Sequence, residues 1–326
     1  MITGRGKQPV AFVVGATGML GARIVECVLQ RGARVRALVR PSTAKDRRGP
    51  LDALAATNGN LEIVQGDVLD PLDHLARAVE GAEVIISAVK GGPDVVVDGQ
   101  SNLVRAAEKA GVPRMVPAAF GYDLQRLDYG DNFLYDLQKK AAEAFVGSAV
   151  KLSYLVCGAW PEMVIQPIVQ VVDFEQGTFS YWGDGDQPCD FTSVLDTAEF
   201  AAAVALDPEV GHTVRVAGEV LTMRQLHQAV ERGSGQALKL RCLGTVDELK
   251  AEIVRRKAAD PNPFTYVALQ FACVAATGKA KAHSLDNDRY PGIRPRKVED
   301  AVRATLFFGS SGNRVGTFGV SSVRGG

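Results

Sequence analysis

Short apolar runs alternate with segments of helical spacing along the first half of the chain. The first run is Val10 to Val14, and after a glycine-containing turn the apolar residues Leu20, Ile24 and Val28 follow at intervals of four. The run is typical of a buried strand, and the spacing is typical of a helix that buries one face. A second apolar run occupies residues 35–39. We therefore predict a strand, a helix and a strand in direct succession.

The same alternation continues beyond this first unit. Further apolar runs predict strands at 61–65, 84–89, 114–121 and 152–156. Segments that we predict to be helical lie between them, at 49–58, 71–80, 100–110 and 131–143. Strands that alternate with helices in this way form a parallel sheet with helices on both faces. We predict an α/β fold, a Rossmann-type doubly wound parallel sheet with a smaller C-terminal substrate-binding region.

The pattern changes after residue 157, and this change sets the expected domains. Residues 1–157 are predicted to form an NAD(P)-binding Rossmann domain. Residues 158–308 are predicted to form a substrate-binding region with the last Rossmann elements interleaved, and Gly183 to Asp186 within it have the residue types of a hairpin turn. Residues 309–326 are rich in glycine and serine and lack periodicity, so we expect a disordered tail.

The glycines of the first turn, Gly15, Gly18 and Gly21, predict a nucleotide site. The first allows a sharp turn out of the strand, the second lets the backbone approach a pyrophosphate, and the third lets the helix lie close to the sheet. Such glycines also serve purely structural bends, but here a strand precedes them and a helix follows. The start of the helix then attracts phosphate. The predicted contacts in this turn are Gly15, Thr17, Gly18, Met19, Leu20 and Gly21.

The end of the second strand indicates which dinucleotide is preferred. An NAD-specific site usually has an acidic residue there, which accepts from the ribose 2′-hydroxyl and repels a 2′-phosphate. This chain has Arg40 at that position and Lys45 shortly after it. A guanidinium group suits a phosphate, so we predict NADP(H), with a solvated basic loop as the alternative interpretation.

Two other strand ends are expected to face the ligand crevice. Asp67 follows the third strand, where its carboxylate is placed to accept from the adenine amino group; a cap for the helix that starts near Pro71 is the alternative. Ser87, Ala88 and Val89 end the fourth strand. We expect the backbone there to run near the nicotinamide ribose.

A tyrosine and a lysine on the helix after the fifth strand are the candidates for catalysis. Tyr135 and Lys139 are four residues apart and therefore share a helix face. A hydride acceptor needs a proton or hydrogen-bond donor as charge builds on its oxygen, and a nearby ammonium group lowers the pKa of a phenol. Such pairs are common on helix surfaces. The position of this one in a dinucleotide fold favours the catalytic interpretation.

Composition narrows the class of protein further. The 326 residues are 46% hydrophobic, and Lys+Arg and Asp+Glu number 37 each, so no net field indicates a nucleic-acid or membrane partner. The five cysteines are scattered without a CxxC pair, and the four histidines have no metal-ligand spacing, so we predict reduced thiols and no metal site. The N-terminus lacks an apolar signal core and no run is long enough for a membrane span, which makes a cytoplasmic location the expectation.

These segments together resemble the isoflavone reductase-like branch of the NmrA-like, atypical short-chain dehydrogenase/reductases. The matching segments are GATGMLG, LVRPSTA, GDVLD, VIISAV, the helix of Gln100, the segment from Phe120 to Asp123, LTMRQL, and YPG before a final helix. The resemblance implies an NADPH-dependent reductase of aromatic, phenylpropanoid-type compounds that works as a monomer or homodimer. It also places Gln100 and Phe120 in segments that contact the cofactor.

The resemblance assigns roles to individual residues. The family has a catalytic or proton-relay lysine on the helix after the fifth strand, which falls on Lys139, supported by Glu143, or on Lys140 if the alignment shifts by one. Arg40 and Lys45 correspond to contacts with the 2′-phosphate. Two features depart from the family pattern: Ala118-Ala119 stands where Ser-Glu often precedes Phe-Gly, and Tyr135 with Lys139 restores the YxxxK spacing of ordinary short-chain dehydrogenases.

Three functions follow from these observations. The first is an NADPH-dependent oxidoreductase that transfers hydride to a phenylpropanoid, lignan, isoflavonoid or quinone. The second is a non-catalytic NADP(H)-sensing regulatory protein of the NmrA-like type, and consumption of NADPH distinguishes the two. The third, a sugar-nucleotide epimerase-type enzyme, would favour tightly held NAD and an acidic residue in place of Arg40.

Overall fold

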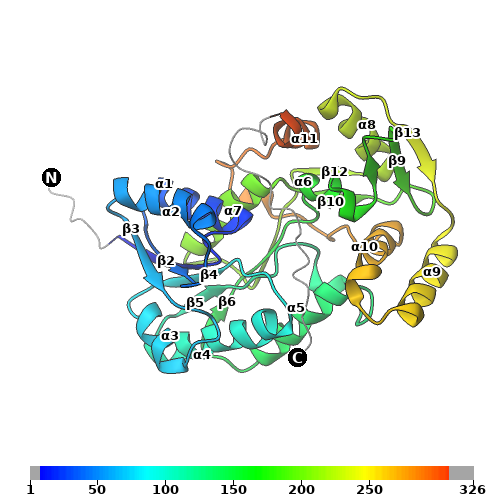
Figure 1. Ribbon diagram of the computed structural model, residues 1–326. Coiled ribbons are helices and arrows are strands. Elements are labelled where there is room, and N and C mark those ends of the chain that lie inside the picture. The colour runs from blue at the N-terminus through cyan, green and yellow to red at the C-terminus, as the bar shows by residue number, and fades with distance from the viewer. Residues whose placement is uncertain (1–7, 308–326) are drawn as a thin grey trace.

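A parallel sheet with helices on both faces forms the larger part of the molecule (Figure 1). The structure, a computed structural model, describes residues 8–307. Six strands lie in the order β3-β2-β1-β4-β5-β6. Their bounds are β1 Val10–Val14, β2 Arg34–Val39, β3 Leu61–Gln65, β4 Val84–Ser87, β5 Arg114–Val116 and β6 Lys151–Leu152. The predicted α/β fold with a doubly wound parallel sheet is confirmed.

Alternate residues of β1 pack into two separate cores. Ala11 and Val13 face the core beneath one helix layer, and Phe12 faces the core beneath the other, as the period of two in a strand requires. The helices of the first layer are α1 Met19–Gln30, α2 Lys45–Thr57 and α7 Val194–Leu206. Those of the second are α3 Leu72–Val79, α4 Gln100–Ala110 and α5 Phe133–Ala144. Since β1 is buried on both faces, its end is held rigidly where the glycine turn begins.

The strand predicted at 152–156 changes its partner halfway. Ser153 donates from its N–H to Met115 O at 3.0 Å, whereas Tyr154 donates to His212 O at 2.8 Å. The chain therefore forms β6 against β5 and then β7 (Tyr154–Val156), which pairs in parallel with β11 (Thr213–Arg215). Strands β7 and β11 thus form a two-stranded sheet that follows directly on β6 and includes a strand from after residue 157.

Two helical segments begin earlier than the apolar pattern indicated. Helix α2 starts at Lys45 instead of near residue 49, because the N–H groups of Arg47 and Arg48 both bond to Ala44 O and Arg48 pairs with Asp52 one turn on. A π-helical turn, η1 (Asp94–Gly99), precedes α4. Both additions lie at the edge of the sheet where the strands end.

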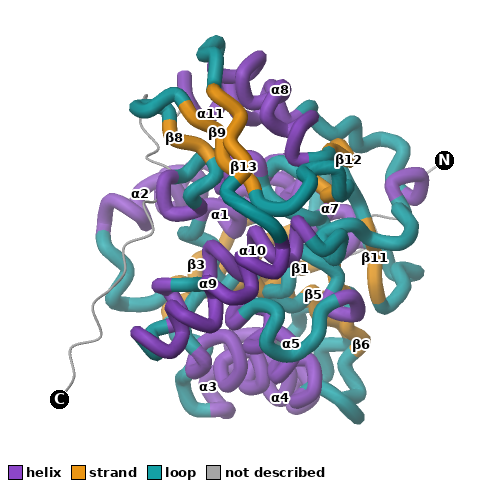
Figure 2. The backbone as a smooth tube through the Cα atoms, turned by 90° about the vertical axis from the view of Figure 1, so that its right-hand side faces the viewer, coloured by secondary structure: helices purple, strands orange, loops and turns teal. Residues whose placement is uncertain are grey.

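A smaller group of strands and helices lies to the right of the sheet in Figure 1. Its strands are β8 Val172–Asp173, β9 Thr178–Tyr181, β10 Cys189–Phe191, β12 Glu219–Leu221 and β13 Lys239–Cys242. Its helices are α6 Pro161–Val164, α8 Met223–Ser234, α9 Val246–Ala259, α10 Val267–Ala276 and α11 Val298–Phe307, with 3₁₀ turns η2 Leu124–Arg126, η3 Pro167–Val169, η4 Pro263–Thr265 and η5 Asn287–Arg289. Figure 2 shows α9 and α10 in front of the central sheet.

The hairpin predicted at Gly183 to Asp186 is wrong. Strand β9 pairs antiparallel with β8 and parallel with β13, while β10, which follows the turn, pairs with β12. Gly183 and Gly185 do turn the chain, with φ of +76° and +75°. Gly183 donates to Gly244 O, just after β13, at 2.8 Å. The start of the turn is therefore bonded to the sheet of β9 and β13, and the chain leaves that sheet before β10 begins.

The predicted tail, 309–326, lies outside the described residues. Within residues 8–307, none of the helices combines the length and the apolarity that crossing a membrane requires. In the same part of the chain, His, Cys, Asp and Glu side chains form no group of three or more that is arranged to hold a metal ion.

Candidate active site

The turn after β1 is packed so closely that its glycines have no room for side chains. Gly15 has φ of +78°, and a Cβ atom there would lie 2.5 Å from Ala88 O at the end of β4. A Cβ atom on Gly21 would lie 2.1 Å from Gly15 O. The turn is thus wedged between β4 and the first turn of α1. A Rossmann fold binds its dinucleotide at the junction where strand order reverses, here between β1 and β4.

The start of α1 has the properties of an anion site. Its N-cap is Gly18, which has no side-chain cap, and the first turn contains no acidic residue. Thr17 is half-buried and Gly18 and Met19 are exposed, whereas Leu20 points into the core. Amides in the first turn of a helix lack partners within the helix, and they attract phosphate. The cradle therefore fits a dinucleotide pyrophosphate.

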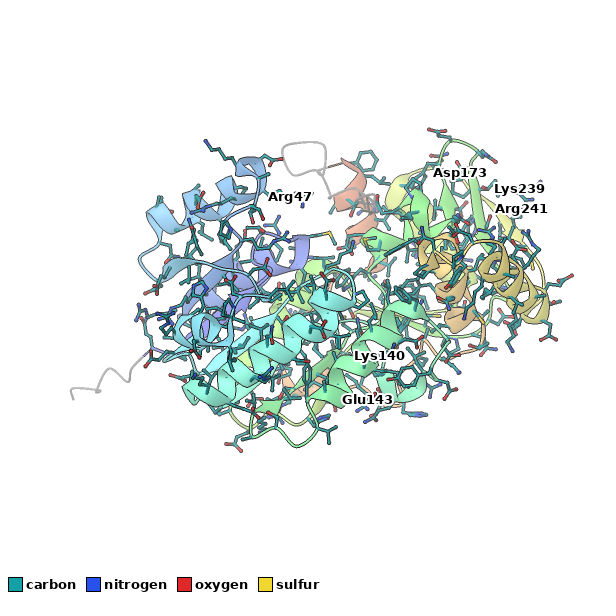
Figure 3. All side chains as sticks on the ribbon, turned by 60° about the horizontal axis from the view of Figure 1, so that its bottom comes forward. Arg47, Lys140, Glu143, Asp173, Lys239 and Arg241 are labelled. Carbon is teal, nitrogen blue, oxygen red and sulfur yellow. The ribbon has the colours of Figure 1, made fainter. Side chains whose placement is uncertain are left out.

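Two cations lie where a 2′-phosphate would distinguish NADP from NAD. Arg40 follows β2 directly and Lys45 is the first residue of α2, and both are exposed. A turn in which Thr43 donates to Arg40 O at 2.9 Å connects the end of β2 to the start of α2. Arg47 extends from the same end of α2 (Figure 3). The positive charge at the end of β2 is complementary to a phosphate.

Replacement of Arg40 by Asp is expected to weaken NADPH binding by roughly a hundredfold, since charge-assisted hydrogen bonds contribute about 1.5–3 kcal/mol. Binding of NADH should change little, because it has no 2′-phosphate. Arg34→Asp is the matched control: it makes the same charge change on an exposed residue at the other end of β2. Fluorescence titration with both nucleotides measures the ratio. Equal losses for NADPH and NADH would remove Arg40 from phosphate recognition.

The other predicted cofactor contacts differ in burial and in whether their side chains are already hydrogen-bonded within the protein. Ser87 is fully buried and its Oγ has no hydrogen-bond partner within the described residues, while Ala88 and Val89 beside it are half-buried. Gln100 is committed to the fold: it accepts from Ala118 N at 2.7 Å and donates to Val96 O at 2.9 Å. Phe120 is half-buried against the core beneath α1 and α7.

Asp67 occupies a local turn. Its Oδ1 accepts from Leu69 N at 3.0 Å, and its own N–H donates to Asp70 Oδ2 at 2.8 Å. The alternative role, a cap for the next helix, does not occur, since the N-cap of α3 is Pro71 without a side-chain bond. Within residues 8–307, no hydrogen bond to its Oδ2 is found.

The surroundings of Tyr135 differ from those that the sequence predicted. The ring is buried, stacks on Tyr122 with centroids 5.6 Å apart, and meets the edge of Phe271. Its hydroxyl accepts from Tyr122 N at 2.9 Å. Burial raises the pKa of Tyr135, whereas the predicted role relied on a lysine that lowers it. The phenol supports the backbone after β5 and is poorly suited to release a proton.

The side chain of Lys139 contacts the loop between β5 and α5 and does not contact Tyr135. Its Nζ donates to Leu127 O at 2.5 Å and lies 5.0 Å from the ring centroid of Tyr129. Tyr129 in turn donates to Glu143 Oε1 at 2.7 Å, and within residues 8–307 Glu143 makes no ion pair with Lys139. Lys140 and Glu143 are exposed on α5 (Figure 3). The helix face thus holds the loop that borders the carboxyl ends of β5 and β7.

Glu162 is a buried carboxyl at this edge that no sequence pattern predicts. This residue follows β7 by a few positions, and its Oε1 accepts from Val194 N, the first amide of α7, at 3.0 Å. Burial raises the pKa of Glu162 to about 7. The only local signal is Pro161 before it, which indicates a helix start and not a buried carboxyl.

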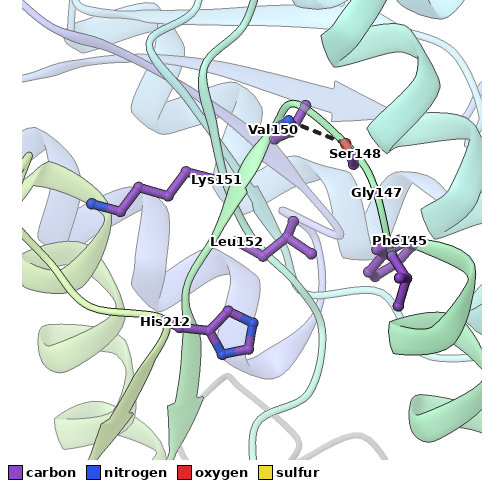
Figure 4. Close-up of a pocket in the computed structure, with 8 residues that line it drawn as sticks. Phe145, Gly147, Ser148, Val150, Lys151, Leu152 and His212 are labelled. Atoms are coloured by element: carbon purple, nitrogen blue, oxygen red, sulfur yellow. Dashed lines mark hydrogen bonds between the residues drawn. The ribbon is translucent and has the colours of Figure 1, made fainter.

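A hollow of about 330 Å³ lies elsewhere on the surface (Figure 4). Phe145, Lys151, Leu152 and His212 line it, together with the turn from Gly147 to Val150. Lys151 begins β6 and His212 precedes β11. Because these are the amino-terminal ends of parallel strands, the hollow is on the edge opposite the nucleotide cradle and takes no part in it.

The fold and the cradle define a dinucleotide-binding α/β protein, and comparison with known proteins specifies its family. Residues 7–282 match the NmrA-like family, so the chain belongs to the NmrA-like family. This confirms the resemblance found in the sequence.

Relatives extend over nearly the whole chain. Pinoresinol reductase 1 of Arabidopsis thaliana is 25% identical, covering 93% of this chain and 98% of its own. The solved structure of AtPrR2 with NADP+ and (+)pinoresinol has a TM-score of 0.76 at 23% identity and covers 92% of this chain and 100% of that one. A complex of leucoanthocyanidin reductase with NADPH from Vitis vinifera has a TM-score of 0.76 at 21% identity, covering 90% of this chain and 98% of that one.

Proposed function

We propose that the protein is an NADPH-dependent reductase that transfers hydride to a small aromatic molecule, of the phenylpropanoid, lignan or isoflavonoid type or a quinone. The observation that carries the proposal is the glycine cradle between β1 and β4 with two exposed cations, Arg40 and Lys45, at the end of β2. Pinoresinol reductases and isoflavone reductase are among the relatives with named activities, and similar structures hold NADP+ or NADPH. When bound, NADPH supplies a hydride to the acceptor.

The residues around the cradle are proposed to bind and orient the nucleotide. The first turn of α1, from Thr17 to Gly21, binds the pyrophosphate, and Arg40 and Lys45 bind the 2′-phosphate. Asp67 accepts from the adenine, and the backbone of Ser87 to Val89 with Phe120 borders the nicotinamide half. Gln100 is proposed to act at a distance, by fixing the chain after β5 through its bond from Ala118.

Proton supply is proposed to depend on α5. Lys139 orients the ribose or relays a proton once its ammonium exchanges Leu127 O for the ligand, and Lys140 is the alternative. Tyr135 is proposed to position the chain after β5, because its hydroxyl is bonded to Tyr122 N. We propose a monomer or homodimer in which each chain has its own complete site.

Replacement of Lys139 by Ala is expected to lower kcat by at least a hundredfold, the usual scale of a lost acid–base group, with little change in the Kd of NADPH. Lys140→Ala is the matched control, since it removes an exposed charge from the next residue of the same helix. Stopped-flow measurement of NADPH oxidation with a saturating acceptor gives kcat for both variants. If Lys139→Ala keeps its turnover and Lys140→Ala loses it, the proposed role in catalysis belongs to Lys140.

The proposed function is tested by the loss of NADPH absorbance with a panel of lignans, isoflavones, quinones and aromatic aldehydes, and with NADH as the control. Consumption with one class and a strong preference for NADPH is expected. Tight binding of NADPH without consumption across the panel would instead favour the NADP(H)-sensing regulatory protein.

A further inference from the structure

The segment after β7 is attached to the first turn of α7 by two side chains. Glu162 Oε1 accepts from Val194 N at 3.0 Å, and Trp160 Nε1 donates to Thr197 Oγ1 at 3.2 Å. Gly158, with φ of +68°, is pressed against β10, since a Cβ atom there would lie 2.0 Å from Asp190 O. The segment is therefore held at both ends where it leaves the sheet.

This attachment lies at the edge of the sheet that binds the nucleotide. Helix α7 packs beside α1 and leads into β11, which runs parallel to β7. Its first turn is thus at the carboxyl ends of the strands, like that of α1. Residues 158–164 pass from β7 into α6 along this edge, on the side of β5 that is away from the adenine half. A hydride acceptor beside the nicotinamide has this segment as its neighbour.

The second oxygen of Glu162 is buried without a hydrogen-bond partner within residues 8–307. Two charged groups act on the carboxyl: Asp196 on α7 opposes its ionisation, and Arg296 before α11 favours it. Arg296 is shared, because it pairs with Asp196 and lies 3.6 Å from Glu199. Asp196 and Glu199 thus already neutralise the guanidinium of Arg296. An ionised Glu162 would have one oxygen without a hydrogen bond, and it would lie near the negative charge of Asp196.

We propose that Glu162 is a positioning residue: in its protonated form it holds residues 158–164 on the first turn of α7 and thereby shapes the place of the aromatic substrate. Only the claim that the segment shapes the place of the substrate rests on the proposed reductase function. The pKa of about 7 puts the change of state at physiological pH. A solvated glutamate ionises near its usual pKa of 4.5, whereas the packed Glu162 keeps its proton up to about 7. The packed arrangement therefore loses stability as the pH rises from about 4.5 through 7, and the segment loosens over this range.

The first test needs no turnover. The chain has two tryptophans, Trp160 and Trp182, so Trp182→Phe leaves Trp160 as the only reporter of the segment. Its emission is expected to change between pH 6 and pH 8 with a midpoint near 7. Glu162→Gln in the same background, which stays neutral, should abolish the change. Glu199→Gln, which removes a neighbouring carboxylate from Arg296, should keep it. A transition that persists in Glu162→Gln, or its absence with Glu162 intact, would overturn the proposal.

The second test separates binding from chemistry. If only the protonated form holds the segment, its population falls about tenfold between pH 6 and pH 8 for a midpoint near 7, and the KM for the aromatic acceptor rises by about the same factor. The KM of Glu162→Gln should be flat over this range, with kcat close to that of the parent. A KM that stays constant with pH in the parent, or that rises tenfold in both the parent and Glu162→Gln, contradicts the claim that Glu162 shapes the substrate's place. If nothing in the panel is reduced, the reductase proposal fails, and the Trp160 titration alone decides the role of Glu162.

Discussion

Replacement of Gly21 by Ala is expected to weaken NADPH binding strongly and to destabilise the fold. The added methyl would lie 2.1 Å from Gly15 O and 2.7 Å from its carbonyl carbon, so α1 must move away from the turn. Overpacking of a rigid site costs about 3 kcal/mol, which lowers the melting temperature by about 5 °C in a chain of this size. A displaced first turn no longer directs its amides at the pyrophosphate, and we expect the Kd to rise by at least roughly a hundredfold.

Gly49→Ala is the matched control for this change. Gly49 is also helical, in α2, but a Cβ atom there would meet no atom within 4 Å. Because Pro50 follows and disfavours a helical residue with a Cβ atom before it, the gain that alanine usually gives in a helix is offset, and the control should change stability little and bind NADPH normally. Calorimetric melting and a fluorescence titration measure both effects. A Gly21→Ala protein that binds NADPH as tightly as its parent would show that the glycine serves packing alone.

Asp196→Ala is expected to lower the free energy of unfolding by about 3 kcal/mol, because it removes several bonds to one buried carboxylate. Asp196 is fully buried, and its Oδ2 accepts from Ser193 Oγ at 2.7 Å and from Arg296 N at 2.8 Å. Its Oδ1 pairs with the Arg296 guanidinium. The carboxylate thus ties α7 to the segment that precedes α11.

The matched control is Asp300→Ala in α11. Asp300 is exposed and bonds to Arg303 at 3.0 Å along the helix, a pair worth about 0.5 kcal/mol or less. Urea unfolding followed by circular dichroism gives both free energies. Equal midpoints for the two variants would show that the Asp196 network contributes no more than a surface pair.

Local signals predicted the elements that form the glycine turn. The turn and the strands on either side are defined by neighbours in sequence and occur as predicted, whereas the contacts of Gly15, Gly21 and Arg40 with a nucleotide stay a prediction. The capping box of Thr222 with Gln225 is local in the same way.

Contacts between distant segments set the limits of the prediction. The spacing of Tyr135 and Lys139 predicted that the two side chains share one helix face. It did not predict the loop that folds over this face, whose backbone is hydrogen-bonded to both side chains. The turn at Gly183 predicted a reversal without revealing that β9 pairs with β13, which lies far along the chain. The burial of Glu162 depends on α7 and α11, which no local pattern associates with it.

The interleaving of the two parts of the molecule bears on how such a protein changes its specificity in evolution. The chain leaves the sheet after β7, returns for α7 and β11, leaves again, and returns once more where Tyr290 and Ile293 pack on the core beneath α1. Excision at residue 157 would expose the pairing edge of β7 and strip the sheet of a covering helix. Sequence changes confined to the segments between these anchor points leave the sheet intact, whereas replacement of everything after residue 157 as one block does not.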